Sequence, residues 1–202
     1  MQLTSRGSSG FTLIEIVMIM TLIGILAAIA IPNFIKMQSR SKQAEARANL
    51  KAFFVAEKGY FANADTYSNL ISIIAFAPER DNRYCYDVGG GASPVWQSRT
   101  TSVTGTDTVP PTQTSIMADT FKYASVGITS VMTSTVTATV TSGQNGTFIA
   151  SAVSNLDGDP TLDQWSISSY NRNSAVASST TQCSVGNNPE GEPRNDINDV
   201  AE

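Results

Sequence analysis

The most pronounced pattern along the chain is a continuous apolar stretch near its N-terminus. From Phe11 to Ile31 almost every residue is apolar or small, and the charged exception is Glu15. About 20 apolar residues are enough for a helix to cross a bilayer. A carboxylate within such a stretch is costly unless another group partners it. The pattern therefore predicts a membrane-length helix that carries one acid in need of a partner.

After Asn33 the pattern becomes one-sided, which predicts that the helix continues with one buried face. Gly59 is the expected stop, so one helix should cover residues 11–58, with residues 11–35 in the membrane. The predicted buried face carries Ala46, Leu50, Phe53 and Phe54, beside Met37, Ala44 and Ala48. The predicted polar face carries Ser41, Gln43, Glu45, Asn49 and Lys51.

Two residues are expected to weaken the helix. Proline in a helix interior costs about 3 kcal/mol, and glycine costs about 1 kcal/mol relative to alanine. Pro32 and Gly24 are these residues. Neighbouring helices in a membrane or bundle can satisfy the freed backbone groups. The segment between Gly24 and Pro32 is therefore predicted to kink or to unwind locally.

Residues 59–202 are predicted to form a globular head in which an antiparallel sheet of about four to five strands lies on the helix. The fold class is α+β. A connecting loop with a short helix near residues 68–75 should come first, and residues 171–202 should be irregular. Residues 143–146 should form a hairpin turn. The strand candidates are residues 84–88, 93–102, 115–126, 127–141, 147–154 and 164–169.

Charge is unevenly distributed along the chain. The net charge is −4; residues 11–58 carry six basic and three acidic groups, and residues 59–202 carry six basic and fourteen acidic groups. A basic stem and an acidic head suggest self-complementary packing or a basic helix face hidden in an assembly; a solvated polar helix is the alternative. Arg6 stands alone before the apolar stretch, whereas Lys36, Arg40 and Lys42 follow it. The charge rule taken alone would place the C-terminal side in the cytoplasm.

The composition argues against several classes of function. The chain has no histidine, the commonest general base and metal ligand. No phosphate-binding glycine loop, nucleophile–base set or paired-carboxylate cleft is visible, so no enzyme activity is expected. The acidic head argues against a dedicated nucleic-acid site. Thr12 and Thr21 are expected to make local hydroxyl bonds to carbonyls.

Two cysteines, Cys85 and Cys183, lie beyond the apolar stretch. If that part of the chain is exported, a disulfide is the natural interpretation, and two buried thiols are the alternative. A bridge across so long a loop would contribute about 4 to 5 kcal/mol in the chain-entropy picture.

One acidic cluster resembles a metal site. Asp157, Asp159 and Asp163 lie within seven residues around a glycine, and their oxygens suit Ca²⁺. The alternative is an Asx-rich turn without metal. Trp165, just after the cluster, is predicted to anchor the core of the head. No other cofactor is expected.

The N-terminal motif resembles that of type IV prepilins. Its residues are Gly10-Phe11-Thr12-Leu13-Ile14-Glu15, followed by Ile23 to Phe34. Residues 76–84 also resemble major pilins of myxobacteria and related bacteria. The resemblance implies that a prepilin peptidase removes the leader, residues 1–10, by cutting after Gly10. It also implies that the same enzyme methylates Phe11 and that the head is exported, against the charge rule.

The resemblance further implies a polymer. Glu15 and Thr12 would belong to the assembly region, and Glu15 would pair with the new ammonium group on Phe11 in one subunit or between neighbours. The alternative is a Glu15 side chain that merely reaches the headgroups. The implied partners are other copies in a helical homopolymer, membrane lipid before assembly, inner-membrane assembly machinery and an outer-membrane secretin. The expected function is adhesion and twitching motility; the alternatives are a minor pilin, a type II secretion pseudopilin, or a membrane-anchored enzyme or binding protein that never polymerises.

Overall fold

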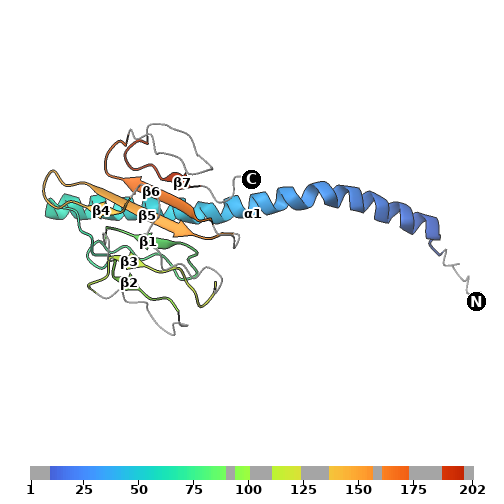
Figure 1. Ribbon diagram of the computed structural model, residues 1–202, viewed down its shortest axis with the longest axis horizontal. Helices are drawn as coiled ribbons and strands as arrows, with labels where there is room; N and C mark the ends of the chain where they lie inside the picture. Colours follow the sequence, from blue (N-terminus) through green and yellow to red (C-terminus); the bar gives the residue numbers. More distant parts are fainter. Residues whose placement is uncertain are drawn as a thin grey trace, which may run out of the picture. The chain divides into compact units, whose positions relative to one another are not determined.

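The computed structural model describes residues 10–89, 94–100, 111–123, 137–156, 161–172 and 188–197. This part of the chain contains one α-helix, α1 (Leu13–Ala64), and one seven-stranded sheet (Figure 1). The strands are β1 (Cys85–Asp87), β2 (Trp96–Gln97), β3 (Ser115–Ile116), β4 (Thr139–Val140), β5 (Phe148–Ser154), β6 (Asp163–Ser168) and β7 (Arg194–Ile197). The expected α+β class, a long N-terminal helix with a sheet, is confirmed.

The chain divides after Gln38 into two units. The first unit holds the apolar part of α1. The second unit, Ser39–Glu202, holds the rest of α1 and all strands, and it is called the head below.

The sheet of the head is mixed and larger than predicted. Its strand order is β2-β3-β1-β5-β6-β7, and β4 pairs with β5. All pairs are antiparallel except β2 with β3, which is parallel. The predicted antiparallel sheet is confirmed for five of the six strand pairs, whereas the expected number of four to five strands was too low. The strand that no predicted candidate covered is β7, which lies in the region expected to be irregular.

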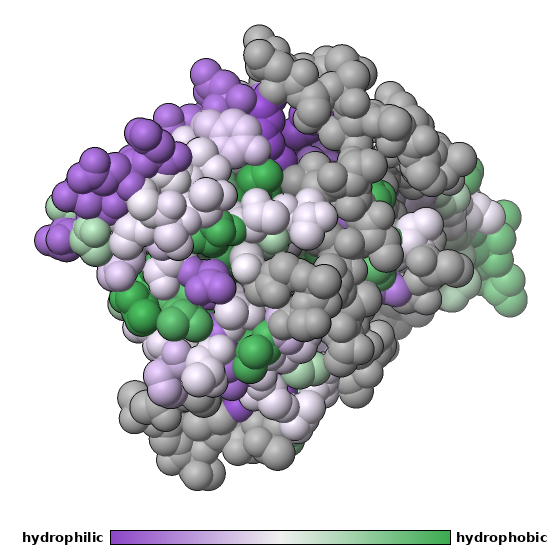
Figure 2. Space-filling view, turned by 60° about the vertical axis from the view of Figure 1, so that its left-hand side comes forward, coloured by the Kyte–Doolittle hydropathy of each residue, from purple (hydrophilic) through white to green (hydrophobic). Residues whose placement is uncertain are grey.

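Both faces of the central strand β5 are covered. Phe148, Ala150 and Ala152 lie in the main core, whereas Val153 packs with Cys85 and Ala118 in a second cluster. This division follows from the alternation of side chains along a strand. Figure 2 shows one face of the head, where hydrophobic residues form small green groups among white and purple ones.

The second half of α1 supplies one side of the main core. Ala46, Leu50 and Phe53 are at most 1% exposed, as their spacing predicted. Phe53 makes edge-to-face contacts with Phe76 and Phe148, with ring centroids 5.3 and 5.5 Å apart. Such pairs contribute about 1 kcal/mol beyond burial. The predicted second line was wrong, because Met37, Ala44 and Ala48 are exposed.

The helix ends later than the sequence suggested. Gly59 lies inside α1, so the predicted end at residue 58 was wrong. Aromatic packing outweighs the low helix propensity of glycine, since Phe61 stacks on Tyr67 at 4.6 Å. The chain leaves the helix at Asp65, which has a φ of 51°, a left-handed conformation that often follows a helix.

Other parts of the head differ locally from expectation. Residues 68–75 form turns and no helix. Residues 194–197, expected to be irregular, form β7, which pairs with β6. The predicted hairpin turn is confirmed, because Gly143 has a φ of 104° and its carbonyl accepts a 2.8 Å bond from the N–H of Gly146. Most of the predicted strand at residues 127–141 lies outside the described residues.

The loop before β7 is held against α1. Lys51 and Lys58 form ion pairs of 2.7 and 2.6 Å with Glu192 and Glu190. Gly191 has a φ of 70°, and a Cβ atom there would lie 2.9 Å from the ring of Phe54. Glycine is therefore required where this loop crosses the helix.

A single buried carboxylate joins α1 to three parts of the sheet region. Asp163 is fully buried, and one of its oxygens accepts bonds from Gln43 of α1 at 2.9 Å and from Asn195 of β7 at 3.1 Å. Its other oxygen accepts bonds from the hydroxyl of Tyr84 at 2.5 Å and from Nε1 of Trp165 at 2.6 Å. A buried carboxylate is tolerated when donors surround it in this way. Gln43, predicted on the polar face, is therefore buried for this contact.

A second buried carboxyl group has few contacts. Glu57 is 0% exposed; one oxygen accepts a long 3.4 Å bond from the N–H of Ser68, and the other has no partner among the described residues. Burial raises the pKa of Glu57 to about 7, and the Ser68 bond lowers it only partly. This side chain is therefore expected to keep its proton at mildly acidic pH.

We predict that Asp163→Asn destabilises the head by about 3 kcal/mol, because an amide nitrogen would face donors that now bind a carboxylate. The measurement is urea unfolding of the full chain in detergent, followed by tryptophan fluorescence. Asp81→Asn is the control, since Asp81 forms an exposed ion pair with Lys122 and should contribute less than about 1 kcal/mol. Equal stability of the two variants would contradict the role given to Asp163.

We also predict a pH effect from Glu57. The folded protein binds this proton more tightly than the unfolded chain, so the contribution is favourable below pH 4.5 and is lost as pH rises through about 7. The loss should reach about 2 to 3 kcal/mol, and Glu57→Gln should remove it. The measurement compares unfolding of both proteins at pH 5 and pH 8. An equal pH dependence in the variant would refute the assignment.

Candidate functional site

The first unit presents an apolar surface that its own residues do not cover. By length and composition, α1 is the one helix in the described part that could cross a membrane. Residues 10–38 are exposed apart from the half-buried Ala27. Phe11, Leu13 and Phe34 are 77%, 82% and 67% exposed. This apolar section is the candidate assembly site.

The start of α1 is fixed by a reciprocal pair of contacts between Thr12 and Glu15. The backbone N–H and the hydroxyl of Thr12 both donate to Oε2 of Glu15, at 2.8 and 2.7 Å. The N–H of Glu15 in turn faces the hydroxyl oxygen of Thr12 at 3.3 Å. This arrangement is a capping box, which satisfies backbone donors that a helix start leaves unpaired.

The capping box corrects one prediction and refines another. Thr12 bonds a carboxylate and not a carbonyl, whereas Thr21 does bond the carbonyl of Met18, at 2.8 Å. The signal for the box was visible as threonine followed by glutamate three residues later. Oε1 of Glu15 accepts no hydrogen bond from the described residues. The box therefore orients the carboxylate and leaves one oxygen available.

The two predicted weak points do not interrupt the helix in the single chain. Pro32 lies inside α1, and the helix is continuous from Leu13 to Ala64. Gly24 has open space around the position of a Cβ atom. Unwinding between these residues stays a prediction for the assembled state.

The predicted calcium cluster is only partly described. Asp163 directs both oxygens to donors of the protein, as described above. Asp157 and Asp159 lie outside the described residues. Within the described ranges, no three histidine, cysteine or acidic side chains come together to hold a metal. The calcium site thus stays a prediction, and the position of Asp163 gives it no support. Trp165 is 6% exposed and anchors the core as predicted.

The predicted disulfide also lies partly outside the described residues. Cys85 is buried in β1, and its sulfur accepts a 3.2 Å bond from the N–H of Ala118. Burial raises the pKa of the Cys85 thiol to about 11. Cys183 is not among the described residues, so the bridge stays a prediction.

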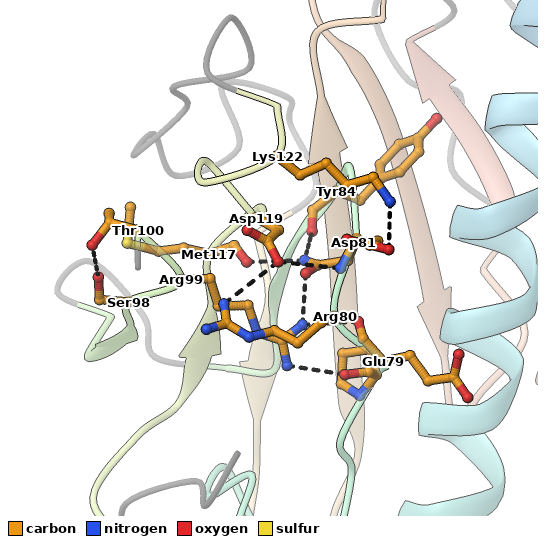
Figure 3. Close-up of polar contacts among 12 residues, drawn as sticks. Glu79, Arg80, Asp81, Tyr84, Ser98, Arg99, Thr100, Met117, Asp119 and Lys122 are labelled. Atoms are coloured by element: carbon orange, nitrogen blue, oxygen red, sulfur yellow. Dashed lines mark hydrogen bonds and ion pairs between the residues drawn. The ribbon is translucent and has the colours of Figure 1, made fainter. Parts of the chain in front are cut away.

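Sequence reasoning missed a buried arginine that holds one loop of the head. Arg99 is 2% exposed, and its guanidinium donates to the carbonyls of Pro78 and Glu79 at 2.9 and 3.0 Å and to Oδ1 of Asn82 at 2.6 Å (Figure 3). Asn82 also donates to the carbonyls of Tyr84 and Met117. No local motif marks Arg99, because its partners lie about twenty residues earlier.

Asp119 completes this polar cluster. It accepts the N–H of Asp81 at 3.2 Å and forms a 3.5 Å ion pair with Arg80. Asp81 has a φ of 73° and forms an ion pair of 2.5 Å with Lys122. The loop at residues 78–82 is therefore held from both sides.

Comparison with known proteins agrees with this arrangement. The family model for type IV pilin PilA matches residues 37–182, and the model for the prokaryotic N-terminal methylation motif matches residues 5–31. The type IV major pilin protein PilA of Myxococcus xanthus is 38% identical over 95% of this chain and 92% of its own length.

Two further relatives are similar over shorter parts. The type IV narrow pilus major component PilA5 of Thermus thermophilus is 31% identical over 64% of this chain and 97% of its own length. The type II secretion system core protein G of Pseudomonas aeruginosa is 34% identical over 34% of this chain and 51% of its own. The type IV pilin family is a family of structural proteins. The chain belongs to the type IV pilin family and is a structural subunit of a type IV pilus.

Proposed function

We propose that this chain is the major subunit of a retractable surface filament used for adhesion and twitching motility. The observation that carries the proposal is the exposed apolar section of α1 with a single carboxylate, Glu15, at its start. Burial of such a surface against other copies stabilises a polymer by about 25 cal/mol per Å² of apolar area. Similarity to a major pilin over almost the whole chain supports the shaft over a minor component.

The proposed life cycle begins in the inner membrane. The apolar section spans the bilayer, the head is exported, and a prepilin peptidase cuts after Gly10 and methylates Phe11. The match to the methylation motif and the exposure of residues 10 and 11 support this step. Inner-membrane machinery then adds the subunit to a filament that passes a secretin in the outer membrane.

Cleavage changes the electrostatics at the start of α1. It creates an ammonium group on Phe11, and methylation keeps the charge. Neither this group nor the carboxylate of Glu15 is tolerated alone in a lipid or apolar core. The capping box holds Oε2, so Oε1 can accept the ammonium group of the same or a neighbouring subunit. A contact between neighbours would set the axial register of the filament.

Local unwinding between Gly24 and Pro32 is part of the same proposal. Pro32 cannot donate a backbone hydrogen bond, so the carbonyl four residues earlier lacks its usual partner. Packing among neighbouring helices then decides whether this segment stays helical. Unwinding of this segment would make the apolar section longer in the filament than it is in the membrane.

A second candidate is a pseudopilin that builds a short secretion filament. The similarity to a type II secretion core protein favours it only for a third of the chain. Filaments on the cell surface, composed mainly of this chain, would decide for the major pilin.

We predict that Glu15→Gln and Glu15→Ala abolish surface filaments or reduce them at least tenfold, because the Phe11 ammonium group would remain unpaired in an apolar core. The measurement is the amount of subunit sheared from cells, together with surface attachment and spreading. The total subunit level in membranes is measured in parallel.

Thr21→Val is the matched control in the same apolar section. The Thr21 hydroxyl bonds only a carbonyl of its own helix, so this variant should assemble normally. Wild-type amounts of filament from both Glu15 variants would disprove the role of the carboxylate. Abundant filaments without attachment or spreading would instead disprove the proposed use.

A further inference from the structure

Very few charged side chains in the described part lack a partner within the chain. Most form ion pairs, accept or donate hydrogen bonds, or lie over aromatic rings. Among the described residues, the exceptions are two cations of α1, Lys36 and Arg40, and two acids of the head, Asp65 and Glu79. All four are exposed. The single chain thus leaves positive charge on the helix and negative charge on the head.

One of these acids lies at a groove. The groove has a volume of about 510 Å³ and runs between α1 and the loop that Arg99 holds. Glu45, Glu79 and Asp81 bring carboxylates to its lining, and Arg80, which pairs with Asp119, brings one cation. Four alanines also line it: Ala52, Ala56, Ala75 and Ala77. A site of this size accommodates side chains and not a whole helix, which is about 10 Å wide.

The three carboxylates of the groove are not equivalent. Glu45 accepts the N–H of Arg83 at 2.8 Å, and Asp81 pairs with Lys122. Glu79 has no such side-chain contact with any described residue, although its carbonyl is fixed by Arg99. Figure 3 shows the Glu79 side chain extending away from the polar cluster toward α1. The groove therefore holds one unpaired acid on a loop of fixed position.

We propose that this groove receives Arg40 of a second copy of the chain, whose guanidinium pairs with Glu79. The inference rests on the proposed function, because it requires a polymer of identical subunits. Lys36, which lies one helical turn before Arg40, brings a second positive charge to the same side of α1. The aliphatic part of arginine packs on the alanines, and its planar end binds the carboxylate in two places.

The occupant follows from the charges of the chain itself. Every subunit brings the same two cations, Lys36 and Arg40, and the same acid at its groove, Glu79, which are unpaired among the described residues. Each copy in a polymer can therefore offer Arg40 to one neighbour and receive the Arg40 of another at its groove. An exposed ion pair is weak in isolation. Repetition along the filament makes it effective, because each subunit is already held close to its neighbours. The contact therefore selects the relative placement of heads.

Charge exchange tests the pair. Glu79→Arg alone and Arg40→Glu alone should each reduce sheared filament by roughly five-fold, because like charges then meet at every subunit. The double variant should return the amount to within about two-fold of wild type. Asp65→Arg with Arg40→Glu is the matched control, since Asp65 is the other unpaired acid, and it should remain as low as Arg40→Glu alone. The amount of sheared filament is divided by the total amount of subunit in the membrane. A variant that fails to fold is then recognised by its low total amount.

Three results would overturn the inference. Single variants that assemble at wild-type levels would show that the charges do not meet. A double variant no better than the single ones would show that they are not partners of each other. Recovery with Asp65→Arg would assign Arg40 to the other acid.

Crosslinking separates this inference from the proposed function. Two tagged copies, one with Glu79→Cys and one with Arg40→Cys, are produced as minor components beside wild-type chain, so that the filament forms from wild-type subunits. A short bismaleimide should join the two tags in sheared filaments only when both new cysteines are present. Filaments without this product, or with a product to an unrelated protein, would reject the groove contact and leave the polymer intact. Absence of filaments from the wild-type chain would reject the proposed function itself.

Discussion

The first half of α1 is an apolar surface that the described residues leave exposed, and the rest of the structure depends on that constraint. Water makes such a surface costly, so it must lie in lipid or against other copies. The second half of α1 differs from the first, because the sheet of its own head covers its apolar face. One helix therefore serves two environments. The division after Gln38 marks the change from one environment to the other.

Polar contacts hold the second half of α1 against the sheet to a greater extent than its hydrophobic pattern suggests. Asp163 receives donors from α1, from β7 and from Tyr84 and Trp165, so its burial fixes the helix against several strands at once. Arg99 performs a similar task for the loop at residues 78–82.

The sequence predicted the parts of the fold that rest on local patterns. The apolar stretch, the buried line from Ala46 to Phe53 and strands β5 and β6 follow from periodicity. The burial of Gln43 could not be predicted, because its partner Asp163 lies 120 residues away. Strand β7 was missed for the same reason, as its few polar residues become a strand only beside β6. At the candidate site the spacing of Thr12 and Glu15 could have predicted the capping box, but Thr12 was expected to bond a carbonyl. The groove beside Glu79 depends on a distant arginine and has no local signal.

The central claim is that the apolar section changes from membrane anchor to filament core once the chain begins at Phe11, where the new ammonium group can meet Glu15. The most direct test is the intact mass of the subunit in filaments sheared from cells. The account predicts a mass equal to residues 11–202 with one added methyl group, confirmed by N-terminal fragments that begin at methylated Phe11. Filament subunits that retain Met1 to Gly10, or that begin at any other residue, would contradict it.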